Sequence, residues 1–100
     1  MHQAASCTSL DEVRQNIDRI DEALVALIAE RGRYVKRAAA FKKTSDDVRA
    51  PQRVEQVIAK VRALATAQQA NPDIAEQVYR AMIAGFVEAE LAEHAALRAN

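Results

Sequence analysis

Arg31 is the one charged residue on an otherwise apolar stripe. Apolar side chains recur from Leu10 to Phe41 at alternating steps of three and four residues, which is the spacing of one face of a long helix. Taking a guanidinium out of water costs on the order of several kcal/mol unless an anion replaces the water. No acidic residue lies on the stripe, so Arg31 needs either a carboxylate from another helix or an anionic ligand. We call the residues on this helix face the apolar stripe. Besides Arg31 they are Leu10, Val13, Ile17, Ile20, Leu24, Leu27, Tyr34, Ala38 and Phe41.

Further cations are spaced so that they could share an anionic ligand with Arg31. Lys42 follows it by about three helical turns, so on one continuous helix the two side chains point within about 20° of each other, ~16 Å apart along the axis. Arg14 lies about 25 Å from Arg31 on the same helix and faces another direction. An antiparallel second copy would bring the partner's Arg14 close to Arg31. Arg53 follows Pro51 in the first turn of a later helix, where a cation opposes the helix dipole unless an anion is near.

Together these cations predict a small dicarboxylate as the ligand. Arginine matches a carboxylate with a fork of two N–H donors, whereas lysine acts as a mobile point charge. Simpler interpretations remain open. Arg31 either fixes the register of helix packing or pairs with Glu90, which lies on an apolar stripe of the third helix. Lys42 and Arg53 are then ordinary surface charges, and Arg14 bonds only to acids of its own helix.

Other kinds of chemistry find no support in the pattern. His2 and His94 stand apart from any Cys or carboxylate at metal-ligand spacing, so we expect no metal site. Cys7 has no candidate general base near it in the sequence, and there is no Gly-rich phosphate loop and no nucleophile–base pair. We therefore expect neither a metal centre nor nucleophilic catalysis.

Composition predicts a single all-α domain spanning residues 1–100. The chain has 100 residues, half of them apolar and 4% aromatic, with two Gly and two Pro. Its 14 basic and 14 acidic residues cancel, which gives no electrostatic reason to expect nucleic acid or a membrane surface as a partner. No apolar run approaches the roughly 20 residues that span a bilayer, and the single Cys7 fits a reducing compartment. We expect a cytoplasmic location.

The order of helices follows from local signals. After residues 1–8, which we expect to be frayed, Ser9 and Glu12 predict a capping box that starts a helix reaching about Lys43. Residues 43–50 are polar and are predicted to form a flexible loop that acts as a lid. Pro51 opens a second helix and Asn71, with Pro72 after it, a third. The second helix presents Val54, Val57, Ile58, Val61, Leu64 and Ala65, and the third is expected to bury Ile74, Val78, Met82 or Ile83, Phe86 and Leu91.

The length of the first helix predicts a homodimer. At ~1.5 Å per residue it spans about 50 Å. A compact monomer of this size has a radius of gyration near ~13 Å, so such a helix would protrude from it. A second copy of the chain is the economical cover for the apolar stripe.

The segment from Leu10 to Lys42 resembles the all-helical chorismate mutase family. The resemblance rests on Arg14, the IDRID run at 17–21, Arg31, the YVK run at 34–36 and Phe41-Lys42. Within the family, Cys7-Thr8 and the run from Ala50-Pro51 to Arg53-Val54 are most similar to the isochorismate pyruvate lyases of salicylate biosynthesis. The similarity covers residues 7–95 and is weaker over the third helix.

The resemblance implies an intertwined dimer of three-helix chains with two shared active sites and no cofactor. The partner's Arg14 and Arg31 would bind the substrate carboxylates, Arg53 would be a further binding arginine, and Lys42 would contact the ether oxygen of the substrate. Mutases commonly carry Glu where this chain has Val54, which favours a lyase; a chorismate mutase is the alternative. Glu90 replaces the family's usual Gln and would have to be protonated to donate to the same oxygen. The remaining substrate contacts implied are Val35, Ala38, Val54, Val57, Phe86 and Val87.

Overall fold

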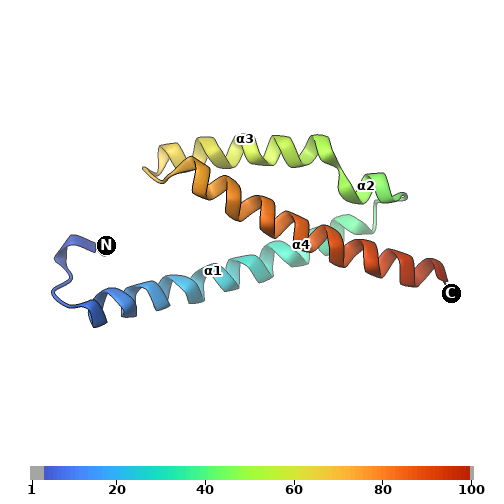
Figure 1. Cartoon of the computed structure of the whole chain (residues 1–100). Coiled ribbons are helices and arrows are strands. Elements are labelled where there is room, and N and C mark those ends of the chain that lie inside the picture. Colours follow the sequence, from blue (N-terminus) through green and yellow to red (C-terminus); the bar gives the residue numbers. More distant parts are fainter. Residues whose placement is uncertain (1–3, 100) are drawn as a thin grey trace. The chain divides into compact units, whose positions relative to one another are not determined.

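The computed structural model describes residues 4–99, and every regular element in this range is helical (Figure 1). This confirms the all-helical fold. None of the described helices combines the length and the hydrophobicity that crossing a membrane requires. The elements are a 3-10 turn η1 at Ala4–Ser6 and helices α1 at Leu10–Ala39, α2 at Ser45–Arg49, α3 at Pro51–Ala67 and α4 at Pro72–Ala99.

The chain divides into two compact units, the first ending at Tyr34 and the second beginning at Val35. The first unit contains η1 and most of α1. The second contains the last turn of α1 together with α2, α3 and α4. The assignment of the whole chain to one domain stays a prediction.

The start of α1 is capped by two neighbouring residues. The Ser9 hydroxyl accepts a hydrogen bond from the backbone N–H of Glu12 at 3.1 Å, as the capping box predicts. The Glu12 carboxylate, however, reaches one residue further back and accepts from the N–H and the hydroxyl of Thr8. Cys7 N–H donates to the carbonyl of Ala4. Residues 4–8 are thus tied to the helix start, where the sequence led us to expect fraying; residues 1–3 lie outside the described range.

The apolar stripe on α1 has no cover in the single chain. No residue of α1 is buried. Leu24 is 50% exposed and Leu27 is 60% exposed, and Leu10, Val13, Ile17 and Ile20 are exposed as well. Large exposed apolar patches are typical of surfaces that another molecule covers.

In the second unit, α3 and α4 form an antiparallel hairpin (Figure 1). Ile58, Val61 and Ala65 are the buried residues of α3, at helical spacing on the face that meets α4. The Asn71 side-chain oxygen accepts from the N–H of Asp73 at 2.8 Å, which confirms Asn71 as the cap of α4.

Burial in this hairpin differs from the expectation on one face. Ile74 and Val78 were expected to be buried but are 59% and 56% exposed, and Leu64 is 53% exposed. The reason is that α4 contacts α3 along one side only, so a second apolar side of the hairpin is left open. Met82, Ile83, Phe86 and Leu91 are half-buried.

The end of α3 closes in a Schellman motif with glutamine at the position that glycine favours. Ala70 N–H donates to the carbonyl of Ala65 and Gln69 N–H donates to that of Thr66, while Gln69 has a positive φ of 60°. We expect Gln69→Gly to raise the free energy of unfolding by about 0.5–1 kcal/mol, because glycine adopts this conformation without a Cβ clash. Urea denaturation of the two proteins measures the difference; a less stable glycine variant would contradict the assigned cap.

Ion pairs on the surface of the hairpin join α3 to α4. The Arg62 guanidinium donates to Asp73 and to Glu76, each at 2.9 Å. The Arg80 guanidinium donates to both carboxylate oxygens of Glu55 and to Glu76. The bond from Arg80 lowers the pKa of Glu55 and that of Glu76 below the ordinary value of 4.5. In the same network the pKa of Arg80 is raised, chiefly by Glu55.

This network gives the hairpin an acid-sensitive contribution to stability. A carboxylate whose pKa is lower in the folded state stabilises the fold above its unfolded pKa, and the contribution disappears as the pH falls through the folded value. We therefore expect the free energy of unfolding to fall as the pH drops below about 4.5, the ordinary value for Glu55 and Glu76. Urea titrations between pH 3 and 7 measure this. Glu76→Gln should flatten the pH dependence, and an equally steep profile in that variant would refute the assignment.

Candidate active site

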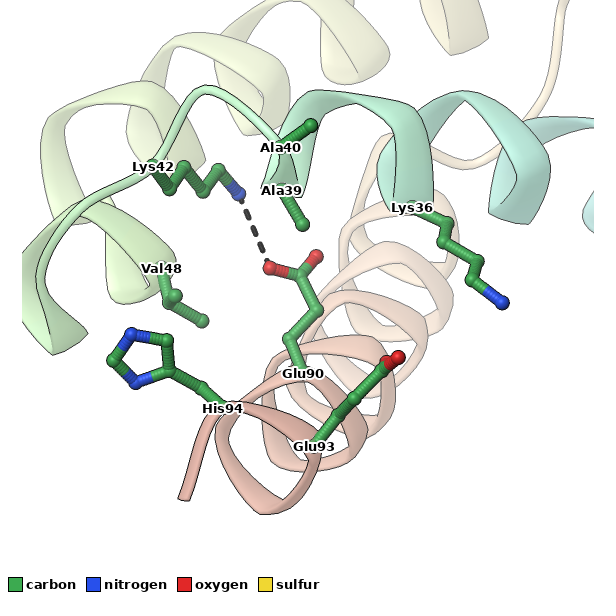
Figure 2. Close-up of a pocket in the computed structure, with 8 residues that line it drawn as sticks. All are labelled: Lys36, Ala39, Ala40, Lys42, Val48, Glu90, Glu93 and His94. Atoms are coloured by element: carbon green, nitrogen blue, oxygen red, sulfur yellow. Dashed lines mark hydrogen bonds and ion pairs between the residues drawn. The ribbon is translucent and has the colours of Figure 1, made fainter. Parts of the chain in front are cut away.

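Lys42 and Glu90 meet in the second unit, although they lie far apart in the sequence. The Lys42 ammonium donates to the Glu90 carboxylate at 3.4 Å (Figure 2). The two side chains are 24% and 11% exposed, so this is a partly buried ion pair. Such a pair costs desolvation, which strong geometry or a ligand must offset. The structure thus brings together the two residues predicted to be catalytic, while their catalytic role stays a prediction.

The ion pair lies in a pocket of about 240 Å³. A pocket of this size can hold part or all of a small metabolite. Its wall combines the end of α1, the following turn, α2 and α4 (Figure 2). The lining residues are Lys36, Ala39, Ala40, Lys42, Val48, Glu90, Glu93 and His94.

Lys42 is carried by a turn and not by the helix. The expected end of the first helix at about Lys43 is wrong, because α1 ends at Ala39. The next residues unwind through short-range bonds, with Phe41 N–H donating to Ala38 and Lys42 N–H donating to Ala39 at 3.1 Å. Helical periodicity therefore no longer relates the direction of Lys42 to that of Arg31, and that part of the spacing argument fails.

The segment after Lys42 contains a helix where a flexible loop was expected. Helix α2 begins with a capping box in which the Thr44 hydroxyl accepts from Asp47 N–H and the Asp47 carboxylate accepts from Thr44 N–H. Val48 is 5% exposed, and α2 packs on α4. Bonds from the backbone N–H groups of Lys43 and Thr44 lower the pKa of Asp47 below its ordinary value. The prediction of an irregular loop is therefore wrong, and its role as a lid stays a prediction.

The other predicted contacts lie outside the pocket wall. Arg53 is exposed in the first turn of α3 and Ala38 is exposed near the end of α1. Arg14 and Arg31 belong to the first unit, and their convergence on Lys42 stays a prediction. The half-buried members of the predicted set are Val35, Val54, Val57, Phe86 and Val87.

Sequence reasoning missed three charged or titratable groups of the pocket. His94 follows Glu90 by one helical turn, so the i,i+4 relation could have found it once Glu90 was singled out. Glu93 lies on the adjacent part of α4, and Lys36 extends from α1 away from the ion pair (Figure 2).

Among the described residues no group of three or more His, Cys, Asp or Glu side chains could hold a metal ion. His2 lies outside them.

Two comparisons with known proteins found related sequences. The chain is 41% identical over 54 residues to an isochorismate pyruvate lyase from Pseudomonas aeruginosa. That match covers 54% of this chain and 54% of the relative, so the similarity spans about half the length of the curated protein. The profile of the chorismate mutase type II family matches residues 13–91, which include Lys42 and Glu90. This chain therefore belongs to the chorismate mutase type II family.

Proposed function

We propose that the protein is an isochorismate pyruvate lyase, which converts isochorismate into salicylate and pyruvate. The observation that supports this most directly is the partly buried Lys42 in a small pocket, with Glu90 opposite it. The similarity to a lyase over about half of the chain favours the same activity, and the family assignment is compatible with it. Chorismate mutase activity, which would yield prephenate, is the alternative that the family assignment supports.

The reaction needs no nucleophile and no cofactor. In one cyclic step the C–O bond of the enolpyruvyl ether breaks, and a ring hydrogen moves to the enolpyruvyl methylene carbon. The ring becomes aromatic salicylate, and the detached arm is released as pyruvate. Negative charge grows on the ether oxygen as the bond breaks, and the Lys42 ammonium would stabilise it. The pocket would also hold the flexible arm over the ring, which lowers the entropic part of the barrier.

The substrate carboxylates would be bound by cations from two copies of the chain. Arg31 and the partner's Arg14 would grip them, with Arg53 as a further cation at the start of α3. The uncovered apolar stripe supports a homodimer, because a second copy would bury it. Val54, in place of the glutamate usual in mutases, favours isochorismate over chorismate. The apolar contacts proposed for the ring and arm are Val35, Ala38, Val57, Phe86 and Val87.

Glu90 would act in its protonated form. An ionised carboxylate accepts hydrogen bonds, whereas a protonated one donates to the ether oxygen beside Lys42. Once substrate enters between the two side chains, their ion pair opens and a proton on Glu90 completes the set of donors. Activity should then rise toward mildly acidic pH.

We expect Glu90→Gln to remove this pH dependence, because an amide donates at every pH. Each pH unit lowers the protonated fraction of a mostly ionised carboxylic acid about tenfold. Wherever Glu90 is mostly ionised, the wild-type rate should therefore fall about tenfold for each further pH unit, while the rate of the variant stays level. Initial rates of salicylate formation between pH 5 and 9 measure this. Superimposable profiles for the two proteins would rule out the proposed role of Glu90.

The activity itself is tested by incubating the purified protein with isochorismate and, separately, with chorismate. We expect fluorescent salicylate and pyruvate in equal amounts from the first substrate. Prephenate from the second substrate at the higher kcat/KM would establish the mutase alternative instead. Turnover of neither substrate would refute both. Lys42→Ala is the matched control for spontaneous breakdown of isochorismate.

A further inference from the structure

The backbone on both sides of Lys42 is held by hydrogen bonds. On one side its own N–H donates to the Ala39 carbonyl at the end of α1, at 3.1 Å. On the other side, the N–H of Lys43 donates to the Asp47 carboxylate at 3.0 Å. This N–H belongs to the peptide group that joins Lys42 to Lys43. Because each peptide group is planar, the two bonds hold the peptide planes on both sides of Lys42. Together they restrict its φ and ψ rotations, and with them the direction in which its side chain leaves the backbone.

Asp47 makes this second bond in addition to capping α2. Its Oδ2 atom accepts from Thr44 N–H at 3.1 Å, and the Thr44 hydroxyl accepts from Asp47 N–H at 3.1 Å. Those two bonds complete the capping box. The bond to Lys43 N–H lies one residue outside the box, on the peptide next to Lys42. A residue that served only the helix start would not need it.

Val48, the next residue, connects this arrangement to the other half of the pocket. Its side chain is 5% exposed and lines the pocket, and α2 packs on α4, the helix that carries Glu90. Asp47 is thus bonded to the Lys42 turn while its neighbour is anchored beside Glu90. The pair of residues sets the position of the turn relative to α4.

We propose that Asp47 is a positioning residue for Lys42: its carboxylate holds the Lys42–Lys43 peptide so that the ammonium enters the pocket toward Glu90, without touching substrate itself. The consequence for catalysis rests on the proposed function, in which Lys42 meets the ether oxygen. The positioning itself does not depend on any activity and can be measured in the free protein.

Amide hydrogen exchange in the homogeneous full chain tests the positioning directly. In Asp47→Ala the N–H groups of Lys43 and Thr44 lose their acceptor, so both should exchange about tenfold faster than in the wild type. Asp46→Ala is the matched control, because it removes a neighbouring exposed carboxylate that makes no side-chain bond to this turn. Unchanged exchange at Lys43 in Asp47→Ala would overturn the proposal. If that variant does not fold, Asp47→Asn takes its place; it keeps one acceptor oxygen, and its Lys43 N–H should exchange at an intermediate rate.

Kinetics with isochorismate and chorismate then test the consequence. We expect Asp47→Ala to lower kcat about tenfold with a smaller change in KM, because a misplaced ammonium weakens transition-state stabilisation more than binding. Asp47→Asn should recover most of the loss and Asp46→Ala should match the wild type. Wild-type kcat in Asp47→Ala, despite accelerated exchange, would overturn the link to Lys42. A wild-type protein that turns over neither substrate would refute the proposed function, while the exchange result would still decide the positioning.

Discussion

Lys42→Ala lowers kcat for isochorismate by at least about a hundredfold. Removing one preorganised donor from a developing oxyanion typically costs 10²–10³ in rate. The effect should be large here because the Lys42 side chain is only 24% exposed, and a partly desolvated charge acts more strongly than one in water. The measurement is the steady-state rate of salicylate formation at saturating substrate.

Matched variants separate this loss from a general effect on folding. Lys42→Gln keeps a donor toward Glu90 without the charge, so it should fold and remain nearly as slow as the alanine variant. Lys43→Ala removes the neighbouring exposed lysine and should retain the wild-type rate. A rate within threefold of the wild type in Lys42→Gln would remove the proposed mechanism even if the fold stands.

Leu24→Glu separates the proposed dimer into single chains and abolishes activity. Leu24 lies in the middle of the apolar stripe and is 50% exposed in the single chain. In a dimer it would be buried, and an unpaired carboxylate there would cost several kcal/mol. Because each proposed site needs the partner's Arg14, separated chains would lack a substrate-binding cation. Sedimentation velocity gives the mass of the particle, and the salicylate assay gives the activity of the same sample.

Ala26→Glu is the control for this variant. It introduces the same charge about half a turn away from Leu24 on α1, off the apolar stripe. We expect it to remain dimeric and active. A wild-type protein that sediments as a single chain while fully active would contradict the shared site.

Several features of the fold could be predicted from the sequence because their causes are local. Ser9, Pro51 and Asn71 each start a helix where the sequence places them, since capping depends on residues a few positions apart. The start of α2 could have been predicted in the same way. Thr44 and Asp47 have capping-box spacing, but the polar composition of residues 43–50 concealed it.

The sequence by itself thus determined the helical class, the family and the two residues of the central ion pair as candidates. Only the tertiary structure decided that Lys42 lies on a turn after Ala39 and forms an ion pair with Glu90. It also decided that Ile74 and Val78 stay exposed in the single chain. The physical reason is the sequence separation over which each kind of interaction acts. Periodicity and caps act over one or two turns, whereas a contact between the end of α1 and α4 depends on how α2 and α3 return the chain between them. That return rests on the burial of Val48 and Ile58. Helical spacing marks Ile58 as an apolar position, but the residues that cover it and Val48 do not follow from a local pattern.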